Sequence, residues 1–184
     1  MVMDFNEMIN QALELKATRA GIVATDAVKF SQELRQMCAQ NYCGNYGKNW
    51  MCPPGVGPFK ELQQKVMEFK QGLVIQTVHE LEDSFDIEGM EQAQSKHNNI
   101  FKGILSMIKN EYNPHRILPL NVGACDICSK CAYAEDKECY FPEKAIASVE
   151  SYGINVMALV SQCDFPYNNG SNTVSYVGYI LFDQ

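Results

Sequence analysis

Apolar residues recur along the first part of the chain at two spacings, which predict helices alternating with short strands. Residues 4–17, 26–38 and 58–72 carry apolar side chains every three or four positions, as one face of a helix does. Residues 21–25 and 73–79 are short apolar runs rich in β-branched side chains, and they are predicted as strands. This part of the chain therefore predicts three helices and two strands.

The second half of the chain continues the same alternation of helical and extended patterns. A long helical pattern over residues 88–112 brings His97 onto its apolar face, where we expect a hydrogen-bonded core histidine and not a metal ligand. Residues 116–122 look extended, and Pro119, which has no N–H to donate, favours an edge strand. The remaining pattern predicts helices over residues 142–151 and 155–161 and a buried strand over residues 171–183.

These elements together predict an α/β or α+β fold, with a small sheet of about four strands and helices packed on it. The length of 184 residues fits a single metal-binding domain over residues 1–184, and an apolar content of 46% is enough for a core. Two loops, residues 38–57 and 123–141, interrupt the pattern. Each follows the end of an element and precedes a helix that a proline starts, so we expect both loops at one end of the sheet.

The net charge argues against a nucleic-acid partner, and the distribution of apolar residues argues against a membrane-spanning segment. The formal net charge is −7, whereas a nucleic-acid-binding protein needs clustered Lys and Arg to neutralise phosphates. No stretch is long and apolar enough to span a membrane, and residues 1–16 lack the basic start and apolar core of a signal peptide. We therefore expect a cytoplasmic protein.

The acidic residues 79–89 are predicted to form a solvated loop, which offers a docking surface for a basic redox partner.

Cysteine content changes the picture, because seven of the eight cysteines fall in the two loops. In a reducing compartment, thiols gathered in this way indicate metal binding and not disulfides. Cys163 stands apart from the other seven, and it is predicted to be a structural residue that packs as a small apolar side chain.

The strongest chemical signal is the spacing C-x2-C-x2-C-x7-C, formed by Cys125, Cys128, Cys131 and Cys139. Three cysteines at two-residue intervals wrap a loop around one centre, so that each sulfur reaches a different corner of a cubane iron–sulfur cluster. Bacterial ferredoxins use a related spacing in which the fourth cysteine serves another cluster. Cys139 comes later than in that motif, and it either completes the local cluster or reaches a second one. A tetrahedral zinc site is the alternative, although zinc sites usually pair two C-x2-C turns.

The first loop has the looser spacing C-x4-C-x8-C, from Cys38, Cys43 and Cys52. Glycines and prolines in residues 43–57 give a stiff, turning backbone that is suited to holding thiolates in place. Trp50 is placed to shield a centre from water. These cysteines are predicted to bind a second centre or to complete the first one. The alternative is a turn-rich loop in which the cysteines only fill space.

Both loops and the C-terminal strand resemble a family described as "predicted metal-binding protein", a cysteine-rich domain of unknown function from anaerobic bacteria and archaea. The resemblance is carried by CGNYGKNWMCPPGVGPF, GACDICSKCAYAEDKECYFPEKAIASVESYGINVMAL and NNGSNTVSYVGYILF. The family's cysteines match Cys43, Cys52, Cys125, Cys128, Cys131 and Cys139. The resemblance implies a bound metal, an iron–sulfur cluster in particular, and an anaerobic setting.

The sequence thus predicts an iron–sulfur protein with one or two clusters of the [4Fe–4S] type that passes electrons to a partner enzyme. Two alternatives stay open. A centre held by only three cysteines would leave an iron position free for substrate, as in a small reductase or a sulfur-handling enzyme. Zinc in place of iron would make the chain an interaction module that metal stabilises.

Overall fold

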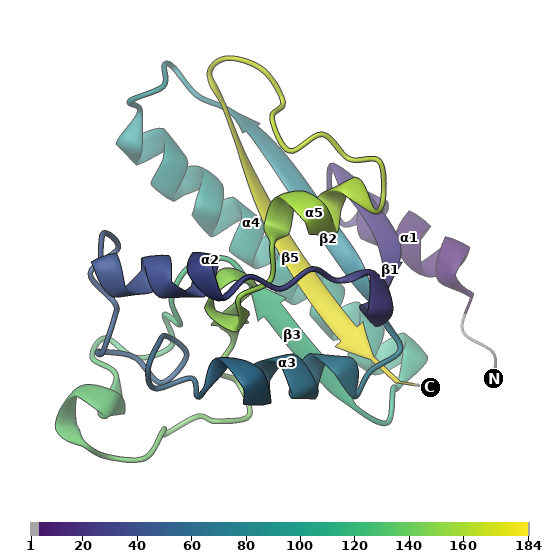
Figure 1. Ribbon diagram of the computed structural model, residues 1–184. Helices are drawn as coiled ribbons and strands as arrows, with labels where there is room; N and C mark the ends of the chain where they lie inside the picture. Colours follow the sequence, from purple (N-terminus) through teal and green to yellow (C-terminus); the bar gives the residue numbers. More distant parts are fainter. Residues whose placement is uncertain (1–3, 184) are drawn as a thin grey trace.

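The computed structural model describes residues 4–183, which form a five-stranded mixed sheet with helices on both faces (Figure 1). The strands are β1 (Arg19–Ala24), β2 (Gln71–Glu80), β3 (Ile117–Asn121), β4 (Ala147–Ser148) and β5 (Thr173–Phe182). The helices are α1 (Phe5–Glu14), α2 (Gln32–Met37), α3 (Phe59–Met67), α4 (Ile87–Met107) and α5 (Val156–Ser161). The α+β class is confirmed, and the described sheet has one more strand than predicted, the two-residue β4.

The strand order is β1-β2-β5-β3-β4, so the C-terminal strand lies in the middle of the sheet. β5 pairs antiparallel with β2 along ten positions and with β3 along four. β4 runs parallel to β3 and pairs only with Leu120 and Asn121. Pro119 is therefore not on an edge strand, but it lies beyond the part of β3 that β4 covers, where a missing N–H is tolerated.

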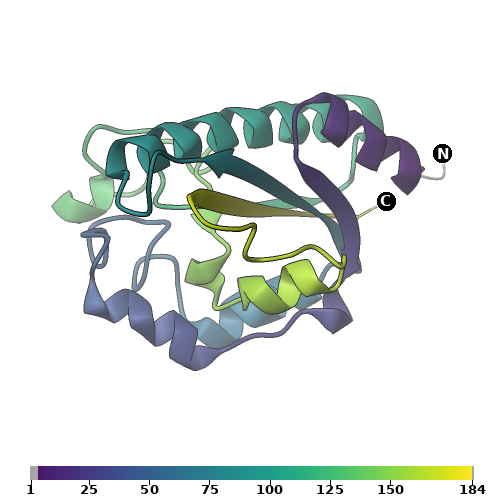
Figure 2. The same ribbon diagram turned by 90° about the horizontal axis from the view of Figure 1, so that it is seen from above.

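Two apolar cores lie on opposite faces of the sheet. Leu73 and Ile75 of β2 pack with α1 and α4, whereas Val74 between them packs with α3 and α5 on the other face. This alternation follows from the two-residue period of a strand. Figure 2 shows α1 and α4 above the sheet and the other helices below it. No helix within residues 4–183 combines the length and the apolarity needed to cross a bilayer.

The predicted helix over residues 26–38 is wrong in its first half. The α-helix begins only after Ser31, whose hydroxyl oxygen accepts a hydrogen bond from the Leu34 N–H at 3.2 Å. Before it, Phe30 forms an antiparallel bridge with Ile154, and this pairing holds the backbone extended. A contact with a residue far along the chain therefore overrides the local helical spacing.

The predicted helix over residues 142–151 is also wrong. This segment contains a turn, then β4, then a 3₁₀ turn over Glu150–Tyr152, because Ala147 and Ser148 pair with β3. A third boundary differs at Gly72, which lies inside β2 and does not end α3. A Cβ atom at Gly72 would stand 2.6 Å from the ring of Tyr179 on β5, so the glycine serves close strand packing.

The long helix and its histidine agree with the prediction. α4 ends at Met107 and continues as a π-helical turn over Ile108–Tyr112. His97 is fully buried, with Nδ1 2.8 Å from Thr77 Oγ1 and Nε2 2.9 Å from Asn121 Oδ1. The prediction of a hydrogen-bonded core histidine is thus confirmed. The predicted short helix after Asn155 and the C-terminal strand are present as α5 and β5.

Candidate metal centre

The two cysteine-rich loops contact each other, and both lie at the lower left of Figure 1. Asn49 Nδ2 donates to the carbonyl oxygen of Cys125 at 3.0 Å. The backbone N–H of Trp50 donates to Cys131 Sγ at 3.4 Å, and its indole Nε1–H donates to the Lys137 carbonyl at 2.9 Å. The first loop thus contacts the second loop through two adjacent residues, Asn49 and Trp50.

The four cysteines of the second loop surround one small space. Its walls include Cys125, Cys128, Cys131 and Cys139. Trp50 reaches the same space from the first loop, and its ring meets Tyr133 edge-on at a centroid distance of 4.8 Å. Tyr140 and Phe141 line the space and are also exposed at the surface. The second loop therefore gathers four thiols near the surface, with aromatic rings beside them.

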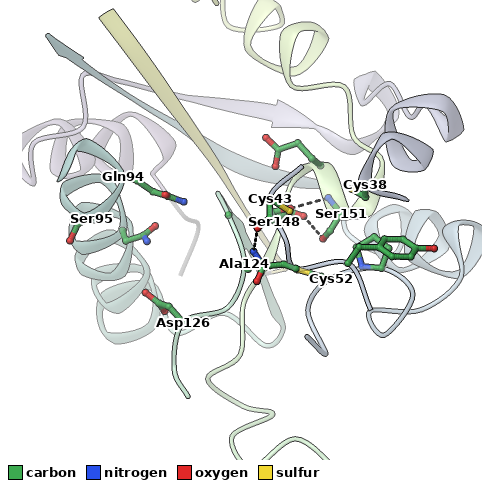
Figure 3. Close-up of a pocket in the computed structure, with 15 residues that line it drawn as sticks. Cys38, Cys43, Cys52, Gln94, Ser95, Ala124, Asp126, Ser148 and Ser151 are labelled. Carbon is green, nitrogen blue, oxygen red and sulfur yellow. Dashed lines mark hydrogen bonds between the residues drawn. The ribbon is translucent and has the colours of Figure 1, made fainter. Parts of the chain in front are cut away.

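The three cysteines of the first loop line a different and larger cavity of about 570 Å³ (Figure 3). Cys38 lies in the 3₁₀ turn that follows α2, whereas Cys43 is exposed and Cys52 is buried within the loop. Figure 3 shows Gln94 and Ser95 of α4 across the cavity from the cysteines. The remaining wall comes from the 3₁₀ turn after β4 and from the start of the second loop.

The pKa of one thiol in the first loop is affected by cysteines of both loops. Burial, followed by the negative charge of neighbouring thiolates, raises the pKa of Cys52 to about 11. The neighbours that contribute are Cys43, Cys38, Cys125 and Cys131, which come from both loops. Cys52 thus lies within electrostatic range of cysteines from both loops.

The thiols share these spaces without forming a single-ion site. Among residues 4–183, no three His, Cys, Asp or Glu side chains stand close enough together to coordinate one ion. A tetrahedral zinc ion with bonds of about 2.3 Å would bring its thiolates to about 3.8 Å from one another. An iron–sulfur cubane instead binds each thiolate to a different iron, so its ligands stand further apart.

Cys163 and the acidic segment between β2 and α4 both lie outside the two cysteine loops. The Sγ atom of Cys163 lies against Gly21 of β1, and the residue packs on the core, as expected for a structural cysteine. The acidic residues between β2 and α4 are mostly exposed, but the Asp86 side chain accepts from the Gly89 N–H at 2.8 Å and caps α4. The acidic segment therefore has a structural role at one position.

Sequence reasoning missed Arg35 and Asn49, which the structure places beside the cysteines. Asn49 is buried, and its oxygen also accepts from the Met51 N–H at 2.9 Å. Arg35 lies one helical turn before Cys38 and donates from Nη2 to the Gly57 carbonyl at 2.9 Å. The only sequence signal for Arg35 is its spacing of three residues from a cysteine at a helix end, which does not reveal that its Nε atom is buried.

A family model described as "Predicted metal-binding protein (DUF2284)" matches residues 21–182, a range that includes both cysteine loops and all strands from β2 to β5. The chain belongs to this family. The resemblance found in the sequence is thereby confirmed, and metal binding by an eight-cysteine member of DUF2284 follows from the family's description. Neither a curated protein nor a solved structure matches the chain.

Proposed function

We propose that this member of DUF2284 is an iron–sulfur protein that transfers electrons to a partner enzyme. Cys125, Cys128, Cys131 and Cys139 would hold a [4Fe–4S] cluster, and Cys38, Cys43 and Cys52 would hold a second centre. When bound, the cluster would supply a one-electron donor and acceptor. The observation that carries the proposal is the enclosure of one small space by all four thiols of the second loop.

The surroundings of these thiols suit such a cluster. The Trp50 N–H donates to Cys131 Sγ, and hydrogen bonds of this kind to cysteine sulfur tune the reduction potential of a cluster. The rings of Trp50, Tyr140 and Phe141 restrict water at the site. Their partial exposure leaves the site near the surface, where a redox partner can approach.

The cavity beside the first loop supports a second candidate function, a small reductase or sulfur-handling enzyme. Three thiols face a space of about 570 Å³, which is large enough for a small molecule. A centre held by only these three cysteines would keep one metal position open to that space. Binding of sulfide or a small thiol that changes the spectrum of this centre would favour the enzyme.

Metal analysis of anaerobically purified protein tests the proposal. Iron, acid-labile sulfide and zinc are measured per chain, with visible absorption and electron paramagnetic resonance (EPR) before and after dithionite. About four iron and four sulfide per chain indicate one cubane, and higher values of both indicate a second centre. One or two zinc ions with no sulfide and no colour would contradict the proposal and favour a zinc-stabilised interaction module.

Variants then assign the metal to the loops. Cys128→Ser is expected to remove the cluster of the second loop, and Cys43→Ser the centre of the first loop. Cys163→Ser serves as the matched control and should retain all metal, because its thiol packs against Gly21 of β1 and Cys163 lines neither of the two cysteine spaces. Unchanged iron in Cys43→Ser would show that the first loop binds none.

A further inference from the structure

Arg35 carries a buried hydrogen-bond donor without an acceptor. Among the buried side-chain nitrogen and oxygen atoms of residues 4–183, Arg35 Nε is the one that has no hydrogen-bond partner, cysteine sulfur included. A buried donor of a charged group that stays unsatisfied is destabilising, because it has lost its hydrogen bond to water and gained none in return. Native structures rarely keep such a group without a reason, and an ion or cofactor that binds there is one such reason.

The position of Arg35 indicates which group would accept this hydrogen bond. The residue lies in the last turn of α2, three residues before Cys38, and its Nη2 is fixed on the Gly57 carbonyl at the far end of the first loop. The guanidinium forms no ion pair with a carboxylate within residues 4–183. The guanidinium is therefore held by the end of the first loop, and no described carboxylate neutralises it.

Electrostatics agrees with this placement. Burial lowers the pKa of Arg35, and negative charge at Cys38, Tyr46 and Cys52 opposes that effect. These three groups all belong to the first loop or its entrance, so the guanidinium lies within electrostatic range of two of the first-loop thiols. An arginine stays protonated in proteins, and its planar donors suit an acceptor of fixed position.

We infer that Arg35 donates its Nε–H to the metal centre held by Cys38, Cys43 and Cys52. The inference rests on the proposed function, because it needs a centre in the first loop. Metal-bound thiolates and inorganic sulfides carry negative charge and accept hydrogen bonds, and both charge and hydrogen bonding set the potential of a cluster. Arg35 is thus a positioning residue that stabilises the electron-rich state of the centre and raises its reduction potential.

Pulsed EPR on the unaltered protein tests the contact directly. The protein is produced with arginine labelled with ¹⁵N at Nε and is reduced with dithionite. A ¹⁵N hyperfine coupling to the signal that Cys43→Ser abolishes is expected from Arg35. The other two arginines bond elsewhere, Arg19 to Gln76 and Arg116 to Asp183, and therefore should not contribute. A first-loop signal without this coupling would overturn the inference and leave the proposed function standing.

Redox titration of variants tests the consequence of the contact. Arg35→Gln is expected to lower the midpoint potential of the first-loop signal and to leave the midpoint potential of the second-loop cluster unchanged. Arg35→Lys should give a first-loop potential between those of the wild type and Arg35→Gln. Arg116→Gln, a surface arginine, serves as the control and should shift neither potential. Unchanged potential in an Arg35→Gln protein with full metal would refute the inference alone. If the wild-type protein and Cys43→Ser contain the same amount of iron per chain, both the proposed second centre and the inference are refuted.

Discussion

Acidification should destabilise this protein through His97, the fully buried histidine of α4. Asn121 Nδ2 donates to Asn98 Oδ1 at 2.8 Å, which turns the Asn121 oxygen toward His97 Nε2 as an acceptor. The proton of the neutral ring therefore lies on Nε2, and Nδ1 accepts from the Thr77 hydroxyl. That hydroxyl also lies 2.9 Å from His79 Nε2. A second proton on His97 would face the Thr77 donor and would be buried without a counter-charge.

Burial is the main reason that the pKa of His97 falls from 6.5 to about 4 in the folded chain. Above pH 6.5 the histidine is neutral in both the folded and the unfolded states, so it adds no pH dependence. Between pH 6.5 and about 4 the unfolded chain binds a proton that the folded chain does not, and the free energy of unfolding decreases. At about 1.4 kcal/mol per pH unit, the loss is about 2 kcal/mol at pH 5 and about 3 kcal/mol at pH 4.

Urea unfolding under anaerobic conditions at pH 7 and pH 5 measures this loss. His97→Gln is the matched control, because its amide can donate and accept but does not titrate. The wild-type protein should lose about 2 kcal/mol more than the variant between the two pH values. Both proteins keep the same cysteines, so acid damage to a metal centre cancels in the difference. Equal losses in the two proteins would refute the assignment of the acid sensitivity to His97.

Three further substitutions test packing and the link between the loops. Trp50→Phe removes the indole hydrogen bond to the Lys137 carbonyl and should lower the free energy of unfolding by about 1 kcal/mol, measured by urea titration. The same variant should lose metal to a chelator faster than the wild type. Gly178→Ala places a methyl group 2.5 Å from the buried Phe101 ring and should lower the free energy of unfolding by about 1–3 kcal/mol. An unchanged melting temperature would contradict this. Cys163→Ala should keep the metal content of the wild type, and a loss of iron would show that this thiol is also a ligand.

The spacing of apolar residues along the sequence predicted the helices and strands whose buried side chains repeat regularly on one face. α4 and β5 are long, and their apolar positions repeat often enough to identify them without any knowledge of the fold. The errors at residues 26–38 and 142–151 have one cause. Phe30 pairs with Ile154, and β4 pairs with β3, and neither contact leaves a periodic signal in the sequence.

The candidate site shows the same division between local and distant information. The spacing of Cys125, Cys128 and Cys131 indicated a shared centre, and the structure places them around one space. The spacing could not show that Trp50 reaches Cys131, or that the half-buried Arg35 has a buried Nε and lies within electrostatic range of Cys38. The first fact depends on how two loops about eighty residues apart in the sequence pack together, and the second on how α2 packs against the end of the first loop at Gly57. Only the fold determines either one.

The bridge made by Asn49 and Trp50 has a consequence for how the holoprotein assembles. Both residues lie between Cys43 and Cys52 in the sequence, yet they bond to the loop that contains Cys125 and Cys131. Whatever orders the first loop therefore lowers the entropy cost of ordering the second, and by linkage the reverse holds as well. We expect metal bound at one of the two proposed centres to raise the affinity of the other loop for its own metal, so that Cys43→Ser and Cys128→Ser each remove one centre and make the remaining one easier for a chelator to strip.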